Sequence, residues 1–142
     1  MKILSAYKVT LEEETEKIAH FLSKEILPGT VIALCGNLGS GKTFFVKKFC
    51  EKRGIFNVTS PSFAIVNVYN GGIKVNHFDF YRINSVGELH EIGFYDYIND
   101  SDAITFIEWA DMFPSILPKV HYEIEFILNE DYSRNITVKK YE

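Results

Sequence analysis

A glycine-rich segment that also holds a lysine and a threonine, "GNLGSGKT", is the part of the sequence best equipped for chemistry. It runs from Gly36 to Thr43 with the spacing Gly-x-x-x-x-Gly-Lys-Thr. Gly36, Gly39 and Gly41 let the backbone turn its N–H groups inward, which forms an anion-binding nest at the start of a helix. Lys42 can reach outer phosphates, and the Thr43 hydroxyl can ligate Mg²⁺. The segment therefore predicts a binding loop for a nucleoside triphosphate.

Two acidic residues that end apolar runs are candidates for the metal side of such a site. Glu108 closes "AITFIE", and Asp79 follows "KVNHF". A triphosphate site needs a carboxylate at a strand end to hold the metal or its waters and to position the attacking water. An ordinary solvated strand end is the alternative for each acid. Which of the two contacts the metal directly stays open.

A hydroxyl-rich segment lies between the loop and the acids, in "VTSPSFAIV". Ser60, Pro61, Ser62 and Phe63, here called the switch segment, fit a plain turn into a strand. They fit equally well a nucleotide switch, because hydroxyls between the first helix and the next strand are placed to sense a γ-phosphate.

Two aromatic residues near the acids, Trp109 and His77, each allow a structural and a functional role. Trp109, the only tryptophan, follows Glu108, and it can pack in the core or contact the nucleotide or a partner. His77 lies in "NHFDF" two residues before Asp79. A hydrogen-bonded structural histidine is favoured there over a catalytic one.

The elements that must position these residues follow from local patterns. The capping-box pattern Thr10-x-x-Glu13 and apolar residues at helical spacing predict a helix over 11–26. The apolar, β-branched run 30–35 predicts a strand buried on both faces, as in parallel sheets, and a helix over 44–53 should follow the loop. Further elements are strands 62–69 and 73–80 joined through Asn70-Gly71-Gly72, a short helix after Ser85, strand 103–108, and an antiparallel pair 121–128 and 134–141.

The chain as a whole predicts one α/β domain over 1–142, with a mixed parallel and antiparallel sheet flanked by helices. Its net charge of −4 argues against bulk attraction to nucleic acid, although a local basic patch stays open. Cys35 and Cys50 lack zinc spacing, so buried, reduced thiols are expected. "MKILSAYKV" is too short an apolar stretch for a signal peptide and no run suits a membrane span, so a cytoplasmic protein is expected.

Several stretches together resemble the bacterial TsaE (YjeE) family of small P-loop ATPases, which are required for threonylcarbamoyladenosine synthesis in tRNA. The resemblance covers residues from about 10 to 136 and rests on "GNLGSGKTFFVKKF", "VTSPSFAIVNVY", "HFDFYRI", "ELHEIGFYDYI" and "FIEWAD". It implies a P-loop NTPase-like fold that binds ATP and Mg²⁺. It also implies partners, namely a TsaD-like transferase and a TsaB-like subunit, with tRNA engaged through the complex.

The resemblance also assigns residues. It implies that Asp79 and Glu108 are metal-linked or water-positioning acids, that Lys42 is catalytic, and that Thr43 is on the metal. The switch segment and Trp109 would be the nucleotide-sensing parts. The nucleotide-binding residues would be Gly36, Asn37, Leu38, Gly39, Ser40, Gly41, Lys42, Thr43, Phe44 and, on a match to a late Gly-Arg pair that is Ser133-Arg134 here, Arg134.

Three functions are compatible with a phosphate-binding loop in a chain of this kind. The first is a slow ATPase, activated within a complex, that supports tRNA modification without performing the transfer. The second is a small-molecule or nucleoside kinase, which needs an acceptor site and a water-excluding lid; no arginine-rich lid segment is visible. The third is a nucleotide-dependent binding module with negligible hydrolysis. The first is expected from the resemblance.

Overall fold

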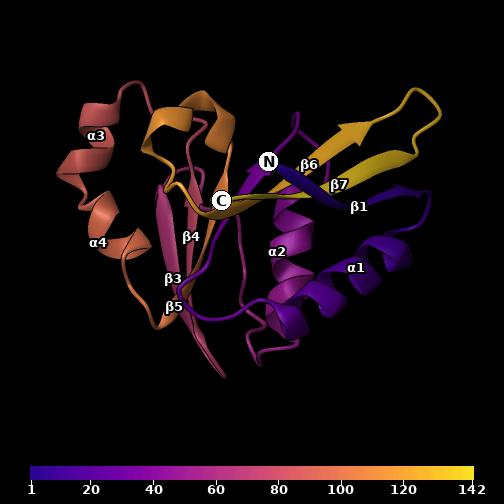
Figure 1. The fold of residues 1–142 in the computed structure, drawn as a ribbon, viewed down its shortest axis with the longest axis horizontal. Coiled ribbons are helices and arrows are strands. Elements are labelled where there is room, and N and C mark those ends of the chain that lie inside the picture. Colours follow the sequence, from indigo (N-terminus) through magenta and orange to yellow (C-terminus); the bar gives the residue numbers. More distant parts are fainter.

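The computed structural model describes residues 1–142, and its centre is a seven-stranded sheet with helices on both faces (Figure 1). The strands lie in the order β1-β7-β6-β2-β5-β4-β3. The strands are β1 Lys2–Val9, β2 Val31–Cys35, β3 Val66–Asn70, β4 Lys74–Asp79, β5 Ala103–Glu108, β6 His121–Leu128 and β7 Arg134–Tyr141. The helices are α1 Glu12–Glu25, α2 Lys42–Glu51, α3 Val86–Glu91 and α4 Phe94–Ile98, with 3-10 turns η1 Ala110–Met112 and η2 Pro114–Ile116.

The sheet is mixed in direction, which confirms the predicted fold class. β2 pairs in parallel with β5 and β6, and β5 pairs in parallel with β4. The remaining ladders are antiparallel: β1 with β7, β6 with β7, and β3 with β4. Every residue of β2 and β5 is buried, because helices cover both faces at the centre of the sheet. Parallel strands end at one edge, so the residues after β2, β4 and β5 meet there.

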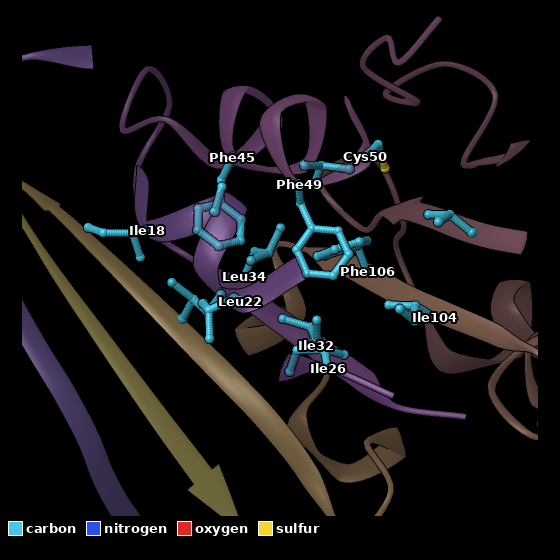
Figure 2. Packing of buried hydrophobic residues seen from close by; sticks show 14 of the residues in the cluster. Ile18, Leu22, Ile26, Ile32, Leu34, Phe45, Phe49, Cys50, Ile104 and Phe106 are labelled. Carbon is cyan, nitrogen blue, oxygen red and sulfur yellow. The ribbon is translucent and has the colours of Figure 1, made fainter. Parts of the chain in front are cut away.

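Helices α1 and α2 lie side by side over one face and bury the larger part of the core (Figure 1). Alternate residues of β2 divide between the faces, and Ile32 and Leu34 point toward these helices. Figure 2 shows Phe45 and Phe49 of α2 above this layer. The Phe49 ring meets the ring of Phe106 edge-on, with 4.9 Å between centroids. This packing fixes α2, and with it the loop that precedes α2, against the strand ends.

The opposite face is covered by α3, α4 and the segment after β5 (Figure 1). Its core receives Val31 and Ala33 from β2 together with a group of phenylalanines. Phe94 of α4 packs edge-on against Phe78 and Phe80 at 5.1 and 5.6 Å between centroids. β4 is therefore fixed from this side, and its last residues are held in place beside β5. No helix has both the length and the apolar composition needed to cross a membrane.

Four sequence predictions need correction. The expected strand 62–69 begins only at Val66, because Ile65 adopts a positive φ of 71° and its N–H donates to Pro61 O at 2.7 Å, which closes a turn. The helix after the loop begins at Lys42 and ends at Glu51. The acid that caps α1 is Glu14, one residue after the expected Glu13; it accepts the N–H groups of residues 10 and 11, each at 3.0 Å.

The fourth correction is β1, which no pattern predicted. Its residues are exposed or partly exposed except Val9, so no run of buried apolar residues marks it. It is held as an edge strand by its ladder with β7, which runs from Lys2 opposite Lys140 to Val9 opposite Arg134. The predicted strands 103–108, 121–128 and 134–141 have the observed bounds, and the glycine hairpin after Asn70 joins β3 to β4 as predicted.

Candidate nucleotide and metal site

A cavity of about 310 Å³ lies where the loop after β2 meets the ends of β4 and β5. Its volume is at the lower end of the range usual for small-ligand sites. Its walls are Glu12, Thr15, Leu38, Gly39, Ser40, Gly41, Lys42, Thr43, Phe44, Ser60, Ser62, Asp79, Glu108, Trp109 and Arg134. The structure thus brings most of the predicted site residues to one place. Gly36, Asn37, Pro61 and Phe63 were predicted for the site but are not in the cavity wall.

The loop has the backbone shape that its glycines permit. Gly39 and Gly41 have φ values of +76° and +110°, in the region that favours glycine. Gly36, at φ +155°, is also confined by space, since an added Cβ would lie 2.6 Å from Ser40 Oγ and 2.7 Å from Phe126 O. Ser40 is 1% exposed, and its hydroxyl has no hydrogen-bond partner. A buried, unpartnered hydroxyl in the wall of a glycine loop suits a phosphate oxygen.

Lys42 is folded back onto the loop. Its Nζ donates to Gly36 O at 2.5 Å and to Asn37 O at 3.0 Å, and it lies 4.3 Å from the centre of the Trp109 ring. Burial lowers the pKa of the Lys42 ammonium, and the negative charge of Glu108 opposes that shift. An ammonium bound by neutral carbonyls and an aromatic ring has no anionic partner of its own, so a phosphate is a better partner for it.

Glu108 is the most highly connected group of the site. Its side chain is nearly fully buried, and both carboxylate oxygens accept from the Thr43 hydroxyl, at 2.9 and 2.8 Å. His77 Nε2 lies 2.6 Å from Glu108 Oε2. The β4–β5 register pairs Asp79 with Glu108, which sets both acids at the same sheet edge.

Asp79 is buried beside Glu108 and accepts two hydrogen bonds. The Tyr81 N–H donates to one oxygen at 2.8 Å, and the Ser62 hydroxyl donates to the other at 3.1 Å. Burial raises the pKa of Asp79 most strongly, the nearby Glu108 raises it further, and the Tyr81 and Ser62 bonds oppose the rise. A cation placed between the two acids would relieve both effects.

The donor atoms around the cavity suit a hard divalent cation. Thr43, Asp79 and Glu108 offer only oxygen, the ligand type that Mg²⁺ prefers, and no sulfur or free imidazole faces them. Magnesium in such sites keeps several waters and binds one or two carboxylates together with substrate phosphates. The residues therefore fit Mg²⁺ bound together with a phosphate chain on the loop.

The switch segment divides between the cavity and the surface. Ser60 and Ser62 line the cavity, with their hydroxyl oxygens 2.9 Å apart. Phe63 is 83% exposed, and the guanidinium of Arg82 lies 4.1 Å from the centre of its ring. The segment thus presents two hydroxyls inward and an aromatic ring outward.

Trp109 combines the two alternatives weighed for it. It is partly buried and packs against the core on the α3 and α4 side, and its ring also edges the cavity beside Lys42. Its φ of +59° is unusual for a residue with a large side chain, and its N–H is fixed to Leu34 O at 3.0 Å. A constrained backbone at this point aims the ring at the cavity.

Sequence reasoning missed two cavity residues, Glu12 and Thr15 in the first turn of α1. The helix-start pattern marked their position in the chain, but only the packing of α1 beside α2 brings them to the loop.

Arg134 was included on a weak motif match, and the structure places it in the cavity wall. One of its terminal nitrogens donates to Gly39 O at 3.4 Å, while its buried Nε has no partner.

Both predicted thiols are buried and free, as expected. Burial raises the pKa of Cys35 and of Cys50 to about 12. Neither thiol lines the cavity, so the chemistry of the site rests on oxygen and nitrogen groups.

Comparisons with known proteins identify the family of the chain. The family model described as threonylcarbamoyl adenosine biosynthesis protein TsaE matches residues 9–136. The tRNA threonylcarbamoyladenosine biosynthesis protein TsaE of Borreliella burgdorferi is 40% identical over 114 residues, covering 77% of this chain and 83% of the relative. The protein of that name from Bacillus subtilis is 36% identical over 127 residues, covering 88% and 78%. The crystal structure of Bacillus subtilis YdiB superposes with a TM-score of 0.79 at 29% identity, covering 100% of this chain and 89% of that one. Since the family model spans most of the chain, including the loop and both paired acids, the chain belongs to the TsaE family.

Proposed function

We propose that this protein binds ATP with Mg²⁺ and hydrolyses it slowly, in support of threonylcarbamoyladenosine modification of tRNA. One observation carries the proposal: Lys42, Thr43, Asp79 and Glu108 converge on one cavity at the start of α2. Family membership supports the tRNA part, since the relatives are named as biosynthesis proteins of that modification.

The residues divide the work as follows. The loop N–H groups and the Ser40 hydroxyl hold phosphate oxygens, and the Lys42 ammonium leaves the Gly36 and Asn37 carbonyls to bind the outer phosphates. Thr43 would hold Mg²⁺ through its hydroxyl oxygen. Bound Mg²⁺ supplies charge neutralisation on the phosphate chain.

The two acids act next to the reacting phosphate. Glu108, fixed by Thr43 and His77, accepts a hydrogen bond from the attacking water and orients it. Asp79 holds the metal or one of its waters and keeps Ser62 close, so the switch segment follows the state of the site. Arg134 and the first turn of α1 close the cavity on the side of the loop.

The protein acts as an accessory subunit. We propose that a TsaD-like transferase and a TsaB-like subunit are its partners, that hydrolysis changes the state of that complex, and that tRNA is engaged through it. The cavity residues serve phosphate and metal, so the threonylcarbamoyl transfer is assigned to a partner rather than to this chain.

The test is a reconstituted tRNA-modification reaction in which phosphate release and modified tRNA are measured in the same samples. Omitting this protein should stop multiple turnover of the modification, and Lys42→Ala should have the same effect. Lys47→Ala is the matched control, because Lys47 is an exposed lysine on the same helix. Full modification with Lys42→Ala would overturn the proposal. Phosphate transfer to an added small-molecule acceptor, in place of release to water, would instead identify a kinase.

A further inference from the structure

A buried hydrogen-bond relay leaves the proposed catalytic carboxylate and ends in the backbone beside the switch segment. It starts at His77, whose side chain is fully buried and whose Nε2 lies 2.6 Å from Glu108 Oε2. A carboxylate can only accept, so Nε2 carries a hydrogen and donates it. Since Glu108 also accepts from Thr43, the ring and the threonine together fix the plane of the carboxylate.

The other ring nitrogen is also engaged. His77 Nδ1 lies 3.1 Å from the hydroxyl of Tyr69, which is 4% exposed. In the neutral ring with hydrogen on Nε2, Nδ1 is an acceptor, and Tyr69 is the donor to it. A partner on the second nitrogen sets the tautomer and the orientation of a histidine. When its hydrogen points to the ring, Tyr69 therefore favours the form of His77 that donates to Glu108.

The tyrosine hydroxyl then reaches the main chain just before the switch segment. It accepts the Thr59 N–H at 3.2 Å, lies 3.0 Å from Thr59 O, and is contacted by the Asn67 amide at 3.3 Å. The hydroxyl has one hydrogen, so donation to His77 and donation to Thr59 O are alternatives. A change at Glu108 that alters the bond to His77 thus alters how firmly Thr59 is held.

The switch segment is consequently tied to both acids. Thr59, the residue before the segment, is linked to Glu108 through Tyr69 and His77, and the third residue of the segment, Ser62, is bound to Asp79 at 3.1 Å. What sets His77 apart from a histidine that only fills the core is the identity of its Nε2 partner, the carboxylate of Glu108 at the proposed metal site.

We propose that His77 and Tyr69 are positioning residues. They orient Glu108 for hydrolysis and couple its state to Thr59 and the switch segment. The first part rests on the proposed ATPase function; the second part concerns the fold of the nucleotide-free protein and is testable without turnover.

Removing the relay should lower turnover and spare nucleotide binding. His77→Leu leaves the loop and Lys42 untouched, so the Kd for Mg-ATP should stay within about threefold, while kcat falls about 10–100-fold, the usual effect of losing a group that orients a catalytic ligand. His77→Gln, whose amide nitrogen can replace Nε2 as donor, should recover part of the loss. Tyr69→Phe keeps the ring packing and should lower kcat about tenfold or less, the size of one lost hydrogen bond.

The deciding arm is a double-mutant cycle with Glu108→Gln. If His77 acts through Glu108, adding His77→Leu to Glu108→Gln leaves kcat unchanged. Multiplied losses would overturn the positioning role, as would an equal loss from His121→Leu, a buried histidine outside the cavity. If Glu108→Gln alone leaves hydrolysis intact, the role that the proposed function assigns to Glu108 fails instead.

Coupling to the switch segment is measured by hydrogen exchange of the nucleotide-free protein. Tyr69→Phe and His77→Leu should speed exchange over residues 59–63 at least severalfold, whereas Tyr122→Phe, a partly buried tyrosine of β6 outside the cavity, should not. Unchanged exchange in both relay variants would overturn the coupling. Should His77→Leu fail to fold, Tyr69→Phe and His77→Gln carry the same comparison.

Discussion

Replacing Gly36 by alanine tests the loop geometry on which the site is built. The added Cβ would lie 2.6 Å from Ser40 Oγ, 2.7 Å from Phe126 O and 3.1 Å from Phe126 Cβ. Ser40 is buried and Phe126 O belongs to β6, so neither neighbour can move freely. The loop or the strand must therefore shift. The Gly36 carbonyl, which accepts the hydrogen bond from Lys42 Nζ, would shift with the loop.

A matched variant isolates the crowding. Gly39 is also at positive φ, but an added Cβ there has no neighbour within 4 Å. Both alanines stiffen the unfolded chain to the same degree, so this effect cancels in the comparison, and both must hold a positive φ in the folded protein, +155° at residue 36 and +76° at residue 39. The remaining difference is the overpacking at Gly36, about 1–3 kcal/mol.

The assay is thermal unfolding without nucleotide, so that contacts to a ligand do not enter. At about 2.1 cal/mol/K per residue, unfolding of 142 residues changes stability by about 0.3 kcal/mol per degree at the midpoint. Gly36→Ala should therefore melt about 3–10 °C below Gly39→Ala. Equal melting temperatures would refute the tight packing of the loop against β6.

Two further predictions concern the ionisable groups. Burial raises the pKa of Asp79, so its charged form is disfavoured in the folded protein. The resulting loss of folding stability is absent at a pH below 3.8, the pKa in the unfolded chain, and is complete at a pH above the folded pKa. Asp79→Asn should therefore raise Tm relative to wild type by an amount that grows as the pH rises above 3.8 and becomes constant once the pH exceeds the folded pKa, while Mg-ATP hydrolysis is lost. A Tm difference that is the same at every pH would contradict this expectation. Cys35 and Cys50 are buried, and burial raises the pKa of each to about 12. They should therefore react with a thiol reagent at pH 8 only as fast as the protein unfolds. Rapid labelling of the folded protein would show that one of the thiols is accessible.

Much of the fold was predictable because its signals are local. The glycine loop needs particular residue types at fixed spacing, and β5, β6 and β7 show either a buried run or strict alternation. The residues before β3 misled because β-branched and aromatic residues favour a strand, while Ile65 in fact takes a positive φ. β1 carried no signal, since its pairing with β7 rather than its own burial defines it.

The sequence predicted the loop and the two acids of the site. It did not predict which residues from distant elements line the cavity or contact the acids. Glu12 and Arg134 reach the cavity only through the packing of α1 and the place of β7 beside β6. The contact of His77 with Glu108 depends on the register of β4 against β5, which local sequence does not specify. The sequence favoured a structural role for His77, whereas in the structure its ring contacts the Glu108 carboxylate.

The central claim is that Glu108 drives hydrolysis of a nucleotide held by the loop. The most direct measurement compares wild type and Glu108→Gln for Mg-ATP affinity and for single-turnover hydrolysis in the presence of the partner proteins. The account predicts similar affinity, because Lys42 and the glycine loop are unchanged, with hydrolysis slower by at least tenfold and on the order of 10²–10⁴. Hydrolysis at the wild-type rate by Glu108→Gln would contradict it.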